Sequence, residues 1–425
     1  MSVLPRHLLP DHAMVGPDGA LCVGGLSLLD LAAEFGTPLF VYDEAHLRAR
    51  CREAVEAFGD GVAYASKAFL CLAMARLAHD EGMWIDVATG GELHVVLAAG
   101  VPASRCVLHG NNKSTAELRA ALTAGIGRIV VDSFDELDRL DALVAEGLTP
   151  PPVSIRVTPG VEAHTHEFVR TGQEDSKFGF GWHSGAAAEA VARARTSSSV
   201  ELVGLHMHIG SQVFVADNFA AAIEAVAPLA REHGLAEFCV GGGLGVAYVE
   251  GEEAPTLSQW ARSVRSACET AGVPGRITAE PGRSIVAAAG MTLYEVGTIK
   301  DIPGIRTYVS VDGGMSDNPR PVLYGSGYET FLPRSPLSDR DRHVRVVGKH
   351  CESGDLLVRS AKVPDDLAVG DILATPVTGA YGHSMGSNYN KVPRPAVVFV
   401  ADGRARLVVR RETNDDLIRL DVPVA

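Results

Sequence analysis

The chain has 425 residues, of which 46% are hydrophobic and 21% are charged, and its formal net charge is −14 at pH 7. This length exceeds what one hydrophobic core of ordinary size accommodates, so two domains are expected. The acidic balance, without a long basic run, argues against nucleic acid and against an anionic membrane surface as partners.

The seven cysteines are widely spaced and include no C-x-x-C pair. This pattern argues against a disulfide framework or a zinc ribbon and favours the reducing cytoplasm. The first residues, M-S-V-L-P-R-H-L-L-P, lack the apolar core of a signal peptide, and no apolar run reaches the length of a membrane span. A cytoplasmic protein with no membrane partner is therefore predicted.

The opening segment, residues 1–37, is distinct from the region after it. A short strand is predicted at residues 21–23, after a turn rich in glycine and proline. Ser27 is a favourable N-cap for a short amphipathic helix over residues 28–35. We expect this segment to contribute to the C-terminal domain, which would make the region between them an insertion.

Residues 38–290 alternate between short apolar runs, which predict strands, and amphipathic stretches, which predict helices. About eight consecutive strand–helix units predict a (β/α)8 barrel of the TIM type, with an open doubly wound sheet as the alternative. The predicted strands are residues 39–42, 62–66, 84–87, 106–109, 128–132, 153–157, 200–207, 237–240 and 276–279.

The sequence pattern changes in residues 291–425, where short strand-like runs are joined by glycine and proline turns and helical periodicity is scarce. They predict an all-β domain. Its predicted strands are residues 292–296, 307–311, 344–347, 371–373, 396–400 and 405–409.

Polar residues follow nearly every predicted barrel strand, and both candidate folds place ligands at the carboxyl ends of their strands. Lys67 follows the strand at residues 62–66, where burial would lower the pKa of the ammonium and yield the neutral amine that Schiff-base chemistry needs. Taken alone, a snorkelling surface lysine is the simpler interpretation. The other strand ends carry Asp86, His109, Asp132, Arg156, His208, the glycines 241–243 and Glu280.

Three of these strand ends give Lys67 a specific role. The backbone N–H groups of G-G-G-L-G, residues 241–245, suit a phosphate, His208 suits stacking on a planar ring, and Glu280 suits a pyridine nitrogen. His206 shares a strand face with His208, but no third ligand stands at a recognisable spacing, so no metal is predicted. The set predicts a pyridoxal 5'-phosphate site.

Several motifs follow one another along the chain in a specific order and spacing. They are Y-A-S-K-A-F (64–69), D-V-A-T-G-G-E-L (86–93), H-G-N-N-K-S (109–114), H-E-F-V-R-T-G-Q-E-D-S-K-F-G (166–179), H-I-G-S-Q (208–212), G-G-G-L-G (241–245), E-P-G-R (280–283), C-E-S-G-D (351–355) and S-N-Y-N (387–390). In these motifs the chain resembles the fold-type III pyridoxal-phosphate decarboxylases over essentially its whole length. The resemblance implies an alanine-racemase-like pairing of the barrel with a C-terminal β domain. It also implies decarboxylation of meso-2,6-diaminopimelate to L-lysine and CO2, the last step of lysine biosynthesis.

The resemblance also implies site roles. Lys67 would bind the cofactor covalently, His208 would stack on its ring and Glu280 would pair with the ring nitrogen. Cys351 would reprotonate the α-carbon, and Glu352 would bind the distal ammonium of the substrate. The further cofactor-binding residues are Ser211, Gly241, Gly242, Gly243, Gly282, Arg283 and Tyr381, and Arg283, Arg320, Tyr324 and Tyr381 would contact the substrate.

A guanidinium binds a carboxylate in bidentate fashion, so two arginines in one pocket favour a substrate with a distal carboxylate over ornithine or arginine. Alone, Arg320 would be interpreted as part of a salt bridge between domains. In this family the loop that matches Cys351 reaches into the partner's active site, so the resemblance implies a homodimer with shared sites.

Two other functions stay open. A sister decarboxylase of this fold would act on another amino acid that ends in a carboxylate. A non-catalytic cofactor-binding homologue would be expected to lose Lys67, Glu280 or Cys351, and this chain keeps all three. A racemase on the same barrel is a further alternative, against which the C-E-S-G-D motif favours decarboxylation.

Overall fold

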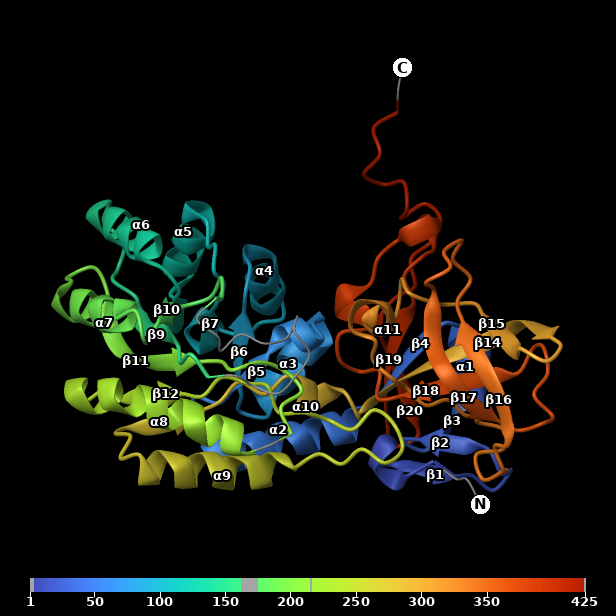
Figure 1. Ribbon diagram of the computed structural model, residues 1–425. Coiled ribbons are helices and arrows are strands. Elements are labelled where there is room, and N and C mark those ends of the chain that lie inside the picture. Colours follow the sequence, from blue (N-terminus) through green and yellow to red (C-terminus); the bar gives the residue numbers. More distant parts are fainter. Residues whose placement is uncertain (1–3, 162–174, 215, 424–425) are drawn as a thin grey trace. The chain divides into compact units, whose positions relative to one another are not determined.

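The computed structural model describes residues 4–161, 175–214 and 216–423, which form two compact units (Figure 1). The barrel unit comprises Arg50–Val246 and Ala254–Ser284, and the β unit comprises Met1–Ala49, Ala247–Glu253 and Ile285–Ala425. Most of the predicted H-E-F-V-R-T-G-Q-E-D-S-K-F-G motif lies outside the described residues. Over the described part of the chain, no helix has the length and apolarity to cross a membrane.

Within the described residues, eight parallel strands form the centre of the barrel unit, in the order β5-β6-β7-β8-β9-β11-β12-β13. Backbone N–H groups of Ala63 and Ala65 donate to the carbonyls of Ala279 and Pro281, which joins the first strand to the end of the last. The predicted (β/α)8 barrel is therefore confirmed. The strands are β5 (Ala63–Ala65), β6 (Trp84–Val87), β7 (Cys106–Leu108), β8 (Arg128–Val131), β9 (Pro152–Thr158), β11 (Glu201–Met207), β12 (Glu237–Cys239) and β13 (Arg276–Thr278), with β10 (Phe180–Gly181) paired to β9.

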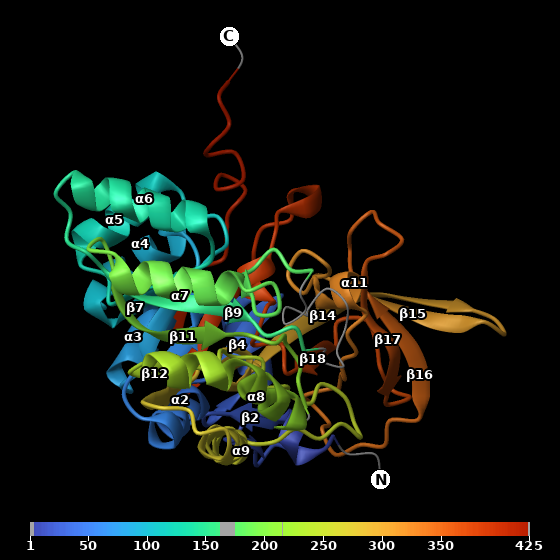
Figure 2. The same ribbon diagram turned by 60° about the vertical axis from the view of Figure 1, so that its left-hand side comes forward.

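Helices cover the outside of this barrel (Figure 2), and their starts follow from local sequence. Ser114 and Thr256 each form a capping box with the residue three positions on, which satisfies N–H groups that a helix start leaves unpaired. The helices are α2 (Glu44–Phe58), α3 (Leu72–Asp80), α4 (Gly90–Ala98), α5 (Thr115–Ala124), α6 (Phe134–Ala145), α7 (Ala186–Thr196), α8 (Ala216–His233), α9 (Leu257–Thr270) and α10 (Arg283–Val286).

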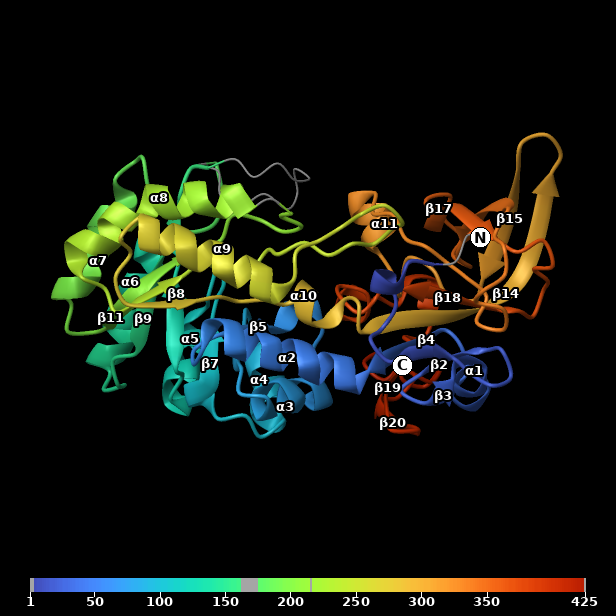
Figure 3. The same ribbon diagram turned by 90° about the horizontal axis from the view of Figure 1, so that it is seen from below.

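Helices α8 and α9 lie side by side (Figure 3) because α9 buries one apolar face. Leu257, Trp260, Val264 and Cys268 recur at helical spacing and are buried. The ring of Trp260 packs on Phe219 of α8, with ring centres 5.4 Å apart. Aromatic packing of this kind contributes roughly 0.5–1.5 kcal/mol beyond area burial.

The interior of the barrel is filled rather than open. Ala63, Val107 and Val130 form a buried cluster against which Trp84 packs. Beneath them the buried carboxylate of Glu237 accepts from both Arg128 and Arg276. A packed interior leaves the carboxyl ends of the strands as the place for a ligand.

The β unit contains, within the described residues, one large mixed sheet ordered β17-β16-β15-β14-β4-β19-β20, with β18 on β14. Strands of the opening segment pair with one another in a separate sheet, β1-β2-β3. Its elements are β1 (Ala13–Val15), β2 (Leu21–Val23), β3 (Leu26–Ser27), α1 (Leu28–Phe35), β4 (Leu39–Asp43), β14 (Gly290–Ile302), β15 (Arg306–Val311), α11 (Arg320–Tyr324), β16 (Arg342–Val347), β17 (Leu356–Val363), β18 (Ile372–Pro376), β19 (Ala396–Ala401) and β20 (Arg404–Val409). Single 3-10 turns are η1 (Arg6–Leu8), η2 (Ser66–Ala68), η3 (Ala103–Arg105), η5 (His383–Met385) and η6 (Tyr389–Lys391).

One predicted barrel strand belongs elsewhere. Leu39–Asp43 forms the strand β4, but it pairs with β14 and β19 of the large β sheet. All five of its residues are buried. A strand that is buried on both faces has a largely apolar sequence in either sheet. The sequence of residues 39–43 therefore does not distinguish a barrel strand from a strand of the β unit.

Candidate active site

Lys67 lies at the carboxyl end of β5, in the single turn η2. Its neighbours Ser66 and Ala68 are buried, whereas Lys67 itself is exposed, so the expectation of a buried lysine is not met. Gly282 packs directly against this segment, since a Cβ there would stand 2.9 Å from both the Cβ and the carbonyl oxygen of Ala65. The backbone around Lys67 is thus tightly packed, while the Lys67 side chain is exposed.

His208 follows β11 and is neutral. Burial is the main cause that lowers the pKa of its imidazole well below the usual value, and the nearby cations Lys67 and Arg156 add to this. Its Nδ1 accepts a hydrogen bond from the N–H of Gly242 at 3.2 Å. A neutral imidazole fixed in this way suits stacking on an aromatic cofactor.

The glycines that follow β12 form a tight backbone loop. Gly241 and Gly243 have φ values of +69° and +110°, which favour glycine. A Cβ at either position would collide with a backbone carbonyl oxygen, of Met207 or of Gly210. The loop therefore accommodates only glycine, as expected where backbone N–H groups approach a phosphate.

Ser211 and Arg283 meet beside this loop. The Nη2 of Arg283 donates to the Ser211 hydroxyl at 2.8 Å, and Arg283 is buried. A guanidinium and a hydroxyl together suit an anionic oxygen. The sequence assigned Ser211 to the phosphate and Arg283 to the cofactor and the substrate, and the structure places these two side chains in contact.

Glu280 follows β13, and both of its carboxylate oxygens have partners. Oε2 lies 2.8 Å from Nε2 of His206, and Oε1 lies 3.2 Å from Nε2 of His109 and 3.3 Å from Sγ of Cys239. Burial would raise the pKa of this carboxyl, but His109 and His206 hold it well below its usual value. Glu280 is therefore an anion inside the barrel.

The residues present fit pyridoxal 5'-phosphate. Lys67 offers the amine, neutral His208 the stacking surface, the glycine loop the phosphate cradle and Glu280 the negative charge for a ring nitrogen. Two buried atoms at the same strand ends, Oδ1 of Asp86 and Nε2 of His109, have no aligned hydrogen-bond partner among the described residues. Such atoms are rare in a protein interior and often mark a functional site.

Arg320, in α11 of the β unit, is buried in an aromatic setting. Its Nη1 donates to the Tyr328 hydroxyl at 2.5 Å and its Nη2 to the Ser326 hydroxyl at 3.0 Å. The guanidinium lies 3.8 Å from the ring centre of Tyr248. The described residues provide it with no carboxylate partner, so the interpretation as a salt bridge finds no support.

Cys351 and Glu352 are exposed on a loop of the β unit. The Cys351 N–H donates to the side chain of Asn390 at 2.9 Å. The loop is fixed by Asp355, whose carboxylate accepts from both the backbone N–H and Nδ1 of His350. Buried Asp355 thus fixes the loop that carries the exposed Cys351 thiol. In the sequence, Asp355 is the last residue of the C-E-S-G-D motif.

Tyr381 and Tyr324 are both half-buried in the β unit. Tyr381 has a φ of +60°, a strained value for a residue with a side chain. Backbone strain of this kind costs about 1–3 kcal/mol and is commonly retained at functional sites.

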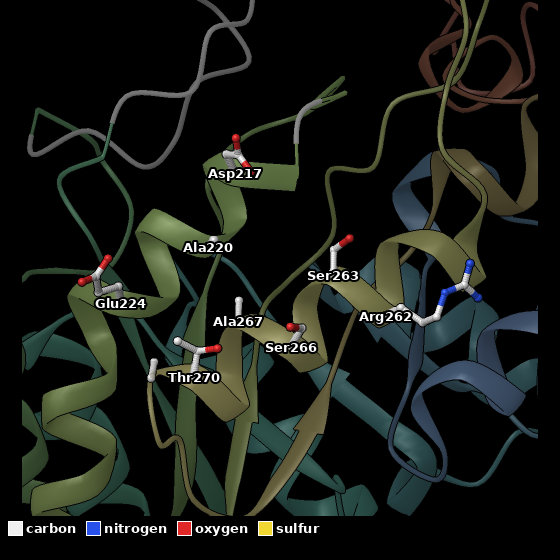
Figure 4. A pocket seen from close by; sticks show the side chains of 9 residues that line it. Asp217, Ala220, Glu224, Arg262, Ser263, Ser266, Ala267 and Thr270 are labelled. Carbon is white, nitrogen blue, oxygen red and sulfur yellow. The ribbon is translucent and has the colours of Figure 1, made fainter.

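A surface hollow of about 580 Å³ lies elsewhere on the barrel unit, between α8 and α9 (Figure 4). Small and charged residues line it, among them Asp217, Glu224 and Arg262. None of the predicted site residues lies in it, so the chemistry and this hollow are separate.

A barrel with a lysine, a neutral imidazole, a glycine loop and an anionic carboxylate at its strand ends defines the class of pyridoxal-phosphate enzymes. Residues 44–287 match the family described as pyridoxal-dependent decarboxylase, pyridoxal binding domain. The chain belongs to this family and, within it, to the diaminopimelate decarboxylases.

Three relatives carry that assignment. The diaminopimelate decarboxylase of Mycobacterium tuberculosis is 48% identical over 442 residues, covering 99% of this chain and 98% of the relative. That of Bacillus subtilis is 46% identical over 421 residues, covering 95% and 96%. A crystal structure of diaminopimelate decarboxylase from M. jannaschii in complex with L-lysine is 32% identical, with a TM-score of 0.91 over 97% of this chain and 98% of that chain.

Proposed function

We propose that this chain is a carboxy-lyase that uses pyridoxal 5'-phosphate to convert meso-2,6-diaminopimelate to L-lysine and CO2. The observation that carries the chemistry is that Lys67, His208 and anionic Glu280 follow three strands of the same barrel, β5, β11 and β13. The similarity to diaminopimelate decarboxylases along nearly the whole chain supports the substrate.

When bound, pyridoxal phosphate supplies an electron sink for the electron pair that remains when a carboxylate leaves an α-carbon. Lys67 would hold the cofactor through its side-chain amine. Glu280 would favour a proton on the ring nitrogen, because a buried carboxylate that stays ionised favours a proton on its partner. His208 would lie against the ring, Ser211 and the glycines 241–243 would bind the phosphate, and Gly282, Arg283 and Tyr381 would complete the cofactor site.

Selection of the substrate falls to the β unit and to Arg283. Among the described residues, buried Arg320 has hydroxyl groups and an aromatic ring as partners and no carboxylate, which supports a role in binding an anion. We assign the distal carboxylate of the substrate to Arg283, Arg320, Tyr324 and Tyr381, and the distal ammonium to Glu352.

Cys351 donates the proton that replaces the lost carboxylate on the α-carbon. Its exposed loop supports a homodimer in which each protomer completes the site of its partner. All seven cysteines are free, which supports a cytoplasmic location.

The proposal is tested by supplying the purified protein with pyridoxal phosphate and separate substrates: meso-diaminopimelate, LL-diaminopimelate, ornithine, arginine and lysine. Product from the meso isomer alone is expected. Product from ornithine or arginine would contradict the assignment of Arg320, and absence of product from all five would contradict the proposed reaction.

A further inference from the structure

The carboxylate of Glu280 is fixed by contacts from several strands. His206 comes from β11, Cys239 from β12, and His109 from just beyond β7. An ionised carboxylate offers about four acceptor sites. Hydrogen bonds from His206 and Cys239 occupy two of these sites, and Nε2 of His109 lies at ion-pair distance from Oε1 without an aligned hydrogen bond, so the barrel residues restrict the directions that remain for a ligand.

The two histidines differ in charge. Burial lowers the pKa of His206, which therefore serves as a neutral donor to Oε2 of Glu280. Burial opposes protonation of His109 as well, but the carboxylates of Glu280 and Asp86 raise its pKa to about 9. His109 is thus the cation of the cluster at neutral pH.

Asp86 provides a second carboxylate on the other side of this cation. Its Oδ1 lies 3.5 Å from the same Nε2 of His109 that contacts Glu280. Burial and the charge of Glu280 raise the pKa of Asp86 to about 7. Lys67, Arg156 and Arg128 also act electrostatically on members of this cluster.

We propose that His109 is a positioning residue that keeps Glu280 ionised and aimed at the cofactor ring nitrogen, with Asp86 as its second counter-charge. Burial alone would favour a protonated Glu280, which could not hold a proton on that nitrogen. The imidazolium at 3.2 Å reverses this preference. The inference rests on the proposed function, which assigns Glu280 to the ring nitrogen.

The test is a double-mutant cycle on cofactor binding, with His109→Asn made alone and together with Glu280→Gln. The dissociation constant for pyridoxal phosphate and the absorbance of the lysine-bound cofactor are measured. Because a hydrogen bond or ion pair to a charged group is removed, affinity should fall about tenfold in the wild-type background. If His109 acts through Glu280, the loss should shrink to less than about twofold in the Glu280→Gln background.

Equal losses in both backgrounds, or no loss in either, would overturn the proposal, since they indicate a purely structural or a neutral role. His109→Gln is the second variant. His94→Asn, at an exposed histidine of α4 in the same unit, is the control and should leave affinity unchanged. Failure of the wild-type protein to bind the cofactor would instead overturn the proposed function.

A second measurement needs no variant. Nitrogen NMR of the holoenzyme with labelled histidine reports which rings carry two protons. At pH 8 an ordinary histidine, whose pKa is about 6.5, is neutral. One ring should still be doubly protonated at that pH, and a spectrum in which every ring is neutral would overturn the proposal.

Discussion

The guanidinium carbon of Arg320 lies over the ring of Tyr248, 3.8 Å from the ring centre, with only 3% of the residue exposed. Within the part of the chain that the structure describes, its hydrogen-bond partners are the hydroxyls of Tyr328 and Ser326. A buried cation without an anion is unfavourable unless a ligand brings the negative charge. This relationship makes Arg320 the residue on which substrate selection is most sharply tested.

Replacement of Arg320 should reduce kcat/KM for meso-diaminopimelate by roughly 10²-fold, because charge-assisted hydrogen bonds to the distal carboxylate are lost. Arg320→Lys should fail similarly, since an ammonium cannot replace a bidentate guanidinium. Arg359→Ala, at an exposed arginine of β17, is the control. Unchanged kcat/KM in Arg320→Ala would contradict the substrate assignment.

Lys67→Ala should abolish both turnover and the absorbance of covalently bound cofactor, because the variant lacks the amine that would attach the cofactor. The matched control is Lys300→Ala, at an exposed lysine of β14, which should retain both. Absorbance and turnover that survive in Lys67→Ala would show that the covalent attachment lies elsewhere.

Cys351→Ala should slow turnover by roughly 10²- to 10⁴-fold, the contribution of a positioned general acid, while cofactor absorbance stays. Asp355→Asn should weaken the same step, since Asp355 holds the loop through His350. Full turnover in Cys351→Ala would show that the Cys351 thiol is not the proton donor.

Shared active sites predict complementation between inactive variants. Lys67→Ala and Cys351→Ala should each be nearly inactive, and a mixture that is allowed to exchange protomers should recover activity, because one of the two sites in a mixed dimer is intact. The measurement is turnover before and after mixing. A mixture as inactive as its components would argue for sites built within one protomer.

The charge on His109 predicts a pH-dependent effect on stability. Its folded pKa of about 9 lies above the unfolded value of about 6.5, so the native state holds the extra proton between these two values. The stability that His109 contributes is therefore fully present below pH 6.5 and is lost as the pH rises through about 9.

The matching measurement is denaturant unfolding of the cofactor-free wild type and of His109→Asn. The difference in unfolding free energy between them should be larger at pH 6.5 than above pH 9. A difference that is constant, or that grows with pH, would show that His109 is not the cation.

Much of the barrel was predictable because each of its eight central strands, β5–β9 and β11–β13, is an apolar run with a polar residue at or just after its end. The two-residue strand β10 was not predicted. The same regularity failed at Leu39–Asp43, whose five buried residues suit either sheet. Lys67 was expected to be buried from its strand, but exposure depends on what covers the strand end, which a local pattern does not contain.

The contacts of Glu280 could not be predicted from the sequence for a related reason. His206 and Cys239 were visible near strand ends, and so was His109. Their distances to Glu280 depend on the register between strands and on the closure of the barrel. Sequence spacing fixes which face a side chain takes on its own strand and leaves the stagger between strands open.

The most direct test of the central claim is the product balance of the purified chain with meso-diaminopimelate and pyridoxal phosphate. We predict that L-lysine and CO2 appear in equal amounts and that the LL isomer gives neither. Cofactor bound at Lys67 without lysine or CO2 from the meso isomer would contradict the claim, as would loss of the substrate without release of CO2.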